Sequence, residues 1–313
     1  MDTRHYEFRI YGLHENEGQI RATTLSRALD ALLGTAERTT RLLATGTGIG
    51  RGARPRWLEV AVDFTITGLK SGSTTIRIDA PRLGETAFAH YAKTDLKRRQ
   101  PKQDETALDL AARSINETQM ANPAGDYFDR AVLEAILKFE KAAGVAGVRY
   151  EMVPTDTADG RFIVDDGTCA RVRDRLNDIP APESHIVSGK LEEINQGNGR
   201  FRLVVNQDSY LSGRICTESL SAETLRPLWG KQITVEGMVH FKANGQARLI
   251  EARRVSTWLE EDGLFEEMPS AEVKEPNSLF TDRMEQARAF NPIKLAGAWP
   301  GDEPIEELLD QLD

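Results

Sequence analysis

The most constraining feature of this chain is a run of short alternating segments between residues 185 and 258. Apolar and polar residues alternate in five segments, which span 185–194, 200–206, 209–216, 231–241 and 246–255. Alternation bounded by turn residues is typical of β-strands with one buried face. Two connections contain Asn-Gly, at 198–199 and 244–245, a dipeptide that favours tight hairpin turns. Residues 221–229 interrupt the pattern and predict a short serine-capped helix that ends at Gly230.

Three strands, a short helix and two further strands are the element order of the oligonucleotide/oligosaccharide-binding (OB) fold, a five-stranded Greek-key barrel. Gly189, Gly213 and Gly237 fall inside the expected strands, where a small closed barrel needs bends or bulges. We therefore expect an OB-like β-barrel over residues 184–258.

The first 180 residues are expected to form a separate α+β domain. Helical spacing of apolar residues predicts helices over about 24–43, 85–98, 105–119 and 127–143. Alternation predicts strands over 6–11, 57–69, 75–80 and 148–153. The run Asp165-Asp166-Gly167 predicts a hairpin turn between strands at 161–164 and 168–172.

The negative charge of the chain is concentrated at its C-terminal end. The whole chain has a net charge of −9, yet residues 259–313 carry 15 acidic and 4 basic side chains. The preceding residues carry 34 acidic and 36 basic side chains and are nearly neutral. Such asymmetry is typical of an interaction tail. The competing interpretation is a solvated segment that only aids solubility.

The acidic segment also contains two predicted helices. Ser278 caps the first, over about 279–290, and Asp302 caps the second, which has Pro304 in its first turn. In the second helix, one apolar face combines Ile305, Leu308, Leu309 and Leu312. Because a helix of roughly nine residues is unstable alone in water, this face is expected to dock on another surface.

The sequence contains no recognisable catalytic motif. It has no HExxH or HxxxH pair, no GxSxG turn, no phosphate-binding lysine loop and no CxxC pair. The glycine-rich run 46–52 lies between a predicted helix and a predicted strand, the reverse of the dinucleotide-binding order, and is interpreted as a connector. We therefore expect that the protein is not an enzyme and that it has no cofactor and no metal site. A catalytic site assembled from residues distant in the sequence is the remaining alternative.

Cysteine usage and hydropathy indicate the compartment. Cys169 and Cys216 are far apart in the chain, which fits two free thiols in a reducing environment, although a disulfide between them is also compatible with the sequence. No apolar run approaches the roughly 20 residues that cross a bilayer. We expect a cytoplasmic protein that does not enter a membrane; the sequence does not indicate its oligomeric state.

The expected barrel has residues that suit nucleic-acid binding. OB-folds bind single strands with a basic groove and stacking aromatics. The candidate residues alternate with apolar positions, and they are Arg202, Arg214, Arg248, Arg254 and Tyr210. Between residues 185 and 258 there are ten basic and seven acidic side chains, a small excess. A purely structural barrel is therefore the competing interpretation.

The run Asn291-Pro-Ile-Lys-Leu-Ala-Gly-Ala-Trp-Pro-Gly-Asp-Glu-Pro-Ile-Glu-Glu-Leu-Leu309 resembles the C-terminal tails of bacterial antitoxin-like proteins that pair with PIN-domain ribonuclease toxins. Leu228-Trp-Gly-Lys231, which leads into Thr234-Val-Glu-Gly237, is similar to larger proteins of that kind. The resemblance covers about 185–313, and we assign residues 1–180 to no family.

The resemblance implies a tail that lies along the nuclease and blocks it. The residues expected to bind the partner are Leu295, Trp299, Pro300, Asp302, Glu303, Ile305, Leu308, Leu309 and Leu312. Two features depart from the family pattern. Many such antitoxins place a basic residue among the acidic metal ligands of the nuclease, whereas Lys294 is the last basic side chain here. The usual small DNA-binding domain is also not recognisable at the N-terminus.

The leading hypothesis is therefore a non-enzymatic, antitoxin-like interaction protein that binds a PIN-type ribonuclease. The alternative is an OB-fold nucleic-acid-binding protein whose acidic tail masks its own groove.

Overall fold

The computed structural model describes the chain in segments up to Val273. They are 2–13, 19–50, 53–70, 74–87, 101–121, 125–157, 159–195, 199–206, 209–215, 220 and 222–273. The two helices predicted beyond residue 278 lie outside the described residues, as do Cys216 and every residue expected to bind the nuclease. Among the described residues, every helix is too short or too polar to cross a membrane.

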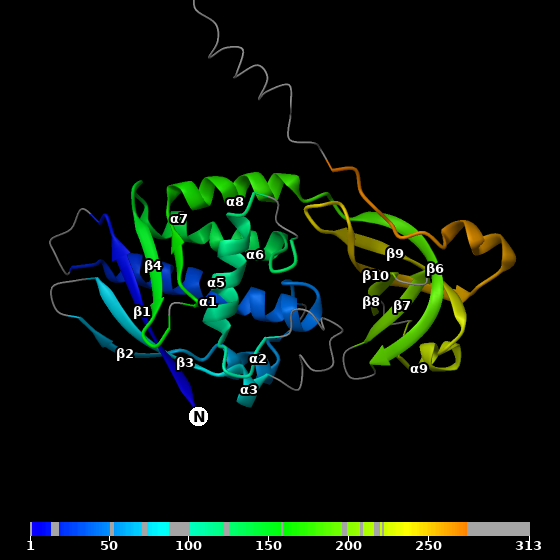
Figure 1. The fold of residues 1–313 in the computed structure, drawn as a ribbon, viewed down its shortest axis with the longest axis horizontal. Helices are drawn as coiled ribbons and strands as arrows, with labels where there is room; N and C mark the ends of the chain where they lie inside the picture. The colour runs from blue at the N-terminus through cyan, green and yellow to red at the C-terminus, as the bar shows by residue number, and fades with distance from the viewer. Residues whose placement is uncertain are drawn as a thin grey trace, which may run out of the picture. The chain divides into compact units, whose positions relative to one another are not determined.

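The first domain, called the α/β domain below because it mixes helices and strands, is built on a five-stranded antiparallel sheet (Figure 1) and so has the α+β architecture expected from the sequence. The strand order is β2-β3-β1-β4-β5. The strands are β1 (Thr3–Tyr11), β2 (Thr65–Leu69), β3 (Thr75–Pro81), β4 (Arg149–Pro154) and β5 (Phe162–Val164). The helices are α1 (Ala22–Thr45), α2 (Arg56–Ala61), α3 (Leu83–Thr86), α5 (Ala107–Thr118), α6 (Arg130–Ile136), α7 (Lys138–Ala143) and α8 (Asp166–Asp178).

One face of this sheet is apolar and packs against the helices. Tyr6, Phe8 and Ile10 alternate along β1 and are buried, because successive side chains of a strand point to opposite faces. Phe8 stacks on Tyr150 of β4 with ring centroids 6.0 Å apart, and Phe139 of α7 packs on Tyr150 at 5.1 Å. The other face of the sheet carries the polar residues of the same strands.

The helices expected over 24–43 and 105–119 are confirmed by α1 and α5, whereas two other predictions were wrong. Residues 57–69 do not form one strand: α2 precedes β2. Leu58 and Ala61 are both buried, so the apolar residues of this run follow helical spacing as well as strand alternation. Asp165-Asp166-Gly167 does not turn a hairpin. Asp165 caps α8, and its carboxylate accepts a hydrogen bond from Thr168 N at 2.8 Å.

A closed five-stranded β-barrel follows, as the alternating segments predicted. Its strands are β6 (Glu183–Asn195), β7 (Arg200–Asn206), β8 (Ser209–Ile215), β9 (Gln232–Phe241) and β10 (Ala247–Thr257). The order is β10-β8-β7-β6-β9, and pairing of β9 with β10 closes the barrel. The only parallel pair among the described strands joins β8 to β10. The predicted helix is present as α9 (Ala222–Leu225) and the 3-10 turn η1 (Arg226–Leu228).

The barrel has its own core, and glycine is required in its interior. Leu203, Leu211 and Val235 are among its fully buried side chains. A Cβ atom at Gly213 would overlap the ring of Phe201, so the ring occupies the space that the glycine leaves. These features are consistent with the OB-like barrel expected from the sequence.

Candidate functional site

The outer surface of β7 and β8, called the β7–β8 face below, holds three of the five residues predicted to bind nucleic acid. Phe201 and Leu203 point into the core, so Arg202 lies on the outside of β7. Tyr210 and Arg214 lie on the outside of β8. The guanidinium of Arg202 is 5.5 Å from the centroid of the half-exposed Tyr210 ring. The face therefore presents an aromatic ring with a cation beside it.

The charge of Arg202 is largely neutralised. Its guanidinium lies 2.8 Å from the carboxylate of Glu192 and 3.8 Å from that of Glu193. The Arg202 side chain is 23 % exposed, whereas those of Glu192 and Glu193 are 49 % and 46 % exposed. The carboxylates are thus more accessible than the cation, which weakens the attraction of this face for phosphate.

A third arginine, Arg200, lies opposite Arg214 across the β7–β8 pair. Burial, together with the positive charge of Arg214, lowers the pKa of Arg200 to about 10. The guanidinium donates a hydrogen bond to the carbonyl oxygen of Ala44 at 2.8 Å. Ala44 lies in the last turn of α1, where unpaired carbonyl groups favour a cation.

The remaining two predicted residues lie elsewhere on the barrel. Arg248, near the start of β10, donates to the carbonyl oxygens of Gly125 and Phe128, the latter at 2.7 Å. It therefore contacts the backbone of the α/β domain. Arg254 is exposed near the end of β10, opposite Glu236 of β9. The structure thus brings Arg202, Tyr210 and Arg214 together but places Arg248 and Arg254 apart from them.

Sequence reasoning missed one exposed aromatic residue of the barrel as a candidate. Trp229, which follows η1, is exposed, and its ring N–H donates to the carbonyl oxygen of Glu192 at 2.8 Å. The hydrogen bond fixes the ring while its surface stays accessible. The Trp229-Gly230 pair indicates the end of a helix and contributes to the family resemblance, but it does not identify Trp229 as a binding residue, because no local pattern distinguishes an exposed tryptophan there from a buried one.

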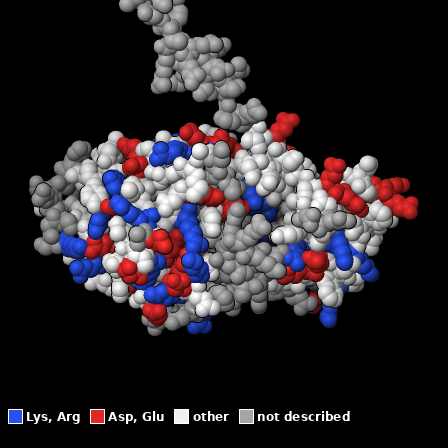
Figure 2. Space-filling view, in the orientation of Figure 1, with Lys and Arg blue, Asp and Glu red and all other residues white. Residues whose placement is uncertain are grey.

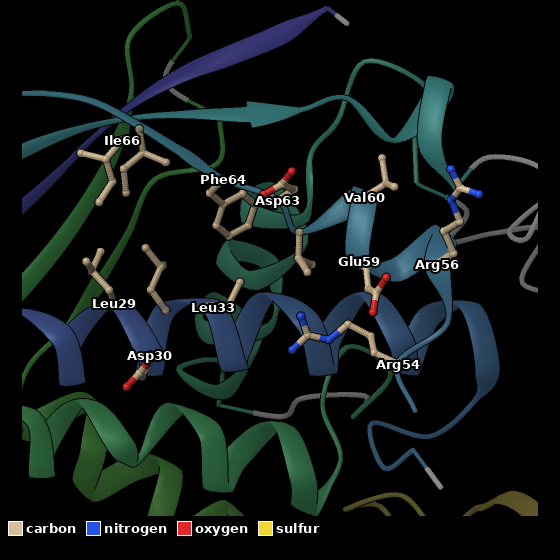
Figure 3. A pocket seen from close by; sticks show the side chains of 13 residues that line it. Leu29, Asp30, Leu33, Arg54, Arg56, Glu59, Val60, Asp63, Phe64 and Ile66 are labelled. Atoms are coloured by element: carbon tan, nitrogen blue, oxygen red, sulfur yellow. The ribbon is translucent and has the colours of Figure 1, made fainter. Parts of the chain in front are cut away.

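A cavity of about 640 Å³ lies in the α/β domain, between α1 and the segment that joins α2 to β2. Figure 3 shows Leu29 and Leu33 of α1 on one side, with Phe64 and Ile66 on the other. Its volume is that of a ligand pocket, and its walls are mainly apolar. Charged side chains also line it, namely Asp30, Arg54, Arg56, Glu59 and Asp63. The cavity suits an apolar group, but its mixed charges do not select a ligand class.

The described residues hold no group of three or more His, Cys, Asp or Glu side chains placed to bind a metal ion. Cys169 is a buried free thiol, and burial raises its pKa to about 11. Such a thiol is largely protonated at neutral pH and is a poor nucleophile.

The comparisons with known proteins give no match. No protein-family model, curated protein or solved structure is significantly similar to this chain. The class of the protein therefore follows from its own architecture, an α+β domain joined to a closed β-barrel that carries an acidic C-terminal segment.

Proposed function

We propose that this chain is a non-enzymatic, antitoxin-like interaction protein that binds a PIN-type ribonuclease through its acidic C-terminal segment. The observation that carries the proposal is the division of charge. Residues 259–313 hold 15 acidic and 4 basic side chains, whereas the preceding chain is nearly neutral. An acidic segment that folds on a partner can cover a large surface, and its charge accelerates encounter with a basic one.

The first part of the acidic segment is hydrogen-bonded to the barrel, which supports a role in tethering a partner. The carboxylate of Asp262, in the 3-10 turn η2 (Glu260–Phe265), accepts a hydrogen bond from the Thr234 hydroxyl of β9 at 2.7 Å. Farther along, Ala271 N donates to the carbonyl oxygen of Gly245 in the β9–β10 turn at 2.9 Å. The described chain is therefore attached to the barrel as far as Ala271. A partner held by the residues that follow would be tethered to this barrel.

Within the segment, Trp299 is the expected anchor, because tryptophan contributes strongly to interface energies. Because the last basic side chain is Lys294, the distal tail would act through carboxylates such as Asp302 and Glu303. These groups would hold the metal of the nuclease or dock beside its active site.

The test compares the full chain with a version that ends at Phe290. Each is co-purified with a PIN-type ribonuclease identified from cell extract by mass spectrometry, and RNA cleavage is then measured with each version present. The full chain should bind and inhibit the ribonuclease, and the shortened chain should do neither while unfolding at the same temperature. Trp299→Ala in the full chain, which preserves all charges, should weaken binding. Equal binding by the full and shortened chains would exclude the proposal.

A second candidate function is single-strand nucleic-acid binding at the β7–β8 face. The pairing of Arg202 with the half-exposed Tyr210 ring favours it. Tyr210→Ala should then weaken oligonucleotide binding by roughly 1–3 kcal/mol, the usual worth of one stacked base. If the acidic tail masks this face, the chain that ends at Phe290 should bind more tightly. Absence of binding by both chains at low salt would exclude this function.

A further inference from the structure

The α/β domain has a polar sheet face of unusual charge arrangement. We call it the open sheet face, because the described helices lie on the other side of the sheet (Figure 1). Its charged and aromatic residues come from alternate positions of three strands and from two flanking side chains, and they share the face with Thr75, Val153 and Ile163; they are His5, Glu7, Arg9, Tyr11, Lys70, Arg77, Asp79, Arg149, Glu151 and Arg161. Five of these residues are cations and three are carboxylates. Figure 2 shows that basic and acidic side chains lie close together on the viewed surface of this domain.

Glu151 is the centre of this face. Its carboxylate lies 3.8 Å from the guanidinium of Arg9 and 3.6 Å from that of Arg149, and it is also paired with Arg161. The hydroxyl of Tyr11 donates to it at 3.1 Å. Burial alone would raise the pKa of Glu151, but hydrogen bonds from Arg161 and Tyr11 and the nearby arginine charges lower it below its ordinary value.

Glu7, like Glu151, is paired with more than one basic side chain. Glu7 lies 2.8 Å from Arg9 and 2.5 Å from Lys70. Hydrogen bonds from Lys70 and Arg9 lower its pKa, so Glu7 and Glu151 are both ionised at neutral pH.

The acidic and basic side chains of these ion pairs differ in how deeply they are buried. The side chains of Glu151 and Glu7 are 4 % and 12 % exposed. Their basic partners are far more accessible, with exposed fractions of 35 % for Arg9, 41 % for Lys70 and 54 % for Arg161. Glu7 and Glu151 thus lie beneath their basic partners, whereas the third carboxylate, Asp79, is 23 % exposed and pairs with His5. An approaching ligand therefore meets N–H donors, and the ion pairs beneath hold these donors in place.

An aromatic ring lies among these cations. Tyr11 is exposed, and the guanidinium of Arg149 lies 5.8 Å from its ring centroid. The hydrogen bond from its hydroxyl to Glu151 orients the ring. A fixed, accessible ring beside cations suits a ligand that combines planar groups with negative charge.

We propose that the open sheet face binds single-stranded nucleic acid, with phosphates on Arg149, Arg161 and the neighbouring cations and a base stacked on Tyr11. Single strands expose the faces of their bases, whereas the bases of a duplex are stacked on one another. An acidic peptide matches the charge, but its carboxylates do not use the ring. This inference concerns a different domain from the acidic segment and the β7–β8 face, so its test is independent of both.

The test measures fluorescence anisotropy of a labelled mixed-sequence 12-nucleotide RNA with the full chain. If four phosphates are neutralised, binding should weaken by about fifty-fold between 50 and 200 mM salt, because each phosphate contact contributes about 0.7 to the logarithmic salt slope. Arg149→Gln with Arg161→Gln should lower that slope by about 1.4. Tyr11→Ala should weaken binding at least about five-fold, and Tyr11→Phe, which keeps the ring, should restore most of it.

A matched control removes the same charge elsewhere. Lys138 and Lys141 are exposed on α7, and replacing both with glutamine should leave binding nearly unchanged. An equal loss in this control would mean unspecific attraction and would overturn the proposal. A loss confined to Arg202→Gln with Tyr210→Ala would move the site to the barrel and would also overturn it. Displacement of the RNA by an acidic peptide, with no effect of Tyr11→Ala, would identify a protein ligand instead.

Discussion

Replacing Glu151 with glutamine would keep the shape of the side chain but remove the negative charge that three arginines share. Breaking a fully buried ion pair costs roughly 3–5 kcal/mol, because the remaining charge has no partner. Here the arginines are partly exposed, with 35 % of the Arg9 and 54 % of the Arg161 side chain accessible, so water replaces part of the lost interaction. We expect a loss of about 1–2 kcal/mol of unfolding free energy.

The loss is measured by urea and thermal unfolding, followed by circular dichroism. For a domain of this size each 1 kcal/mol lowers Tm by about 2–4 °C. The control is Glu134→Gln, which removes an exposed carboxylate 3.9 Å from Arg38 and should cost less than about 1 kcal/mol. If Glu151→Gln is no more destabilising than Glu134→Gln, the reasoning about a shared buried charge is refuted.

The destabilisation caused by Glu151→Gln should decrease at acidic pH. Because the pKa of Glu151 in the folded chain lies below its ordinary value of 4.5, ionised Glu151 stabilises the fold at neutral pH. This contribution is complete above the ordinary pKa and is lost as the pH falls through the lower folded value. The difference in stability between the original chain and Glu151→Gln should therefore narrow below pH 4.5.

The same variant separates stability from ligand binding. Removing the charge of Glu151 raises the net charge of the open sheet face by one. Because no cation is lost, the salt slope of RNA binding in Glu151→Gln should be at least as large as in the original chain, even if the freed arginines lower the affinity. A smaller salt slope in the folded variant would contradict the assignment of phosphate to these cations.

Three further substitutions test the fold. Gly213→Ala should cost about 1–3 kcal/mol in urea unfolding, because its Cβ would overlap the buried ring of Phe201. Gly34→Ala, in the interior of α1 where the added Cβ has no heavy atom within 4 Å apart from the backbone of its own helix and its chain neighbours, should instead stabilise the chain by about 0.5–1 kcal/mol. Asp165→Ala should cost about 1 kcal/mol through loss of the cap of α8, and a stability unchanged at neutral pH would refute that role. Because the hydrogen bond from Thr168 N lowers the pKa of Asp165, the cost should shrink as the pH falls below 3.8.

The barrel could be predicted from the sequence because its signals are local. Each strand alternates over several residues, and the turn at Asn244-Gly245 joins strands that pair with each other. In the sheet of the first domain, the central strand pairs with strands that are distant in the sequence, so local signals do not predict the pairing. The central strand, β1, pairs with β3 and β4, and Arg9 lies opposite Glu151 across a long sequence separation. Strand order and the cluster around Glu151 therefore require tertiary structure.

The two wrong assignments have a common physical cause. Asp and Gly suit a tight turn, but Asp also accepts hydrogen bonds from the first backbone N–H groups of a helix. The residues that follow Asp165 favour a helix over a hairpin, because Cys169 and Val172 are three positions apart and both are buried on one side of α8. The same ambiguity explains α2, where Leu58 and Ala61 satisfy helical spacing within an alternating run.

Alternation also does not show whether an arginine on the outside of the barrel is accessible to a ligand. Alternation correctly places Arg202 and Arg214 on the outside, but it does not identify what lies outside. For Arg248 the outside is the backbone of the α/β domain, whose carbonyl oxygens at Gly125 and Phe128 accept its hydrogen bonds. A basic residue on the outer surface of a barrel is thus not necessarily available to a ligand.

The depth of each charge, more than the number of cations, distinguishes the two surfaces of this chain. On the β7–β8 face, Arg202 is 23 % exposed beneath carboxylates of which Glu192 is 49 % exposed. On the open sheet face the order is reversed, because Glu151 is 4 % exposed beneath Arg161 at 54 %. Both faces contain ion pairs, but only in the pairs of the open sheet face is the cation more exposed than the carboxylate. A phosphate can bind such a cation without displacing its partner, and for that reason we propose the open sheet face, and not the β7–β8 face, as the surface that would bind nucleic acid.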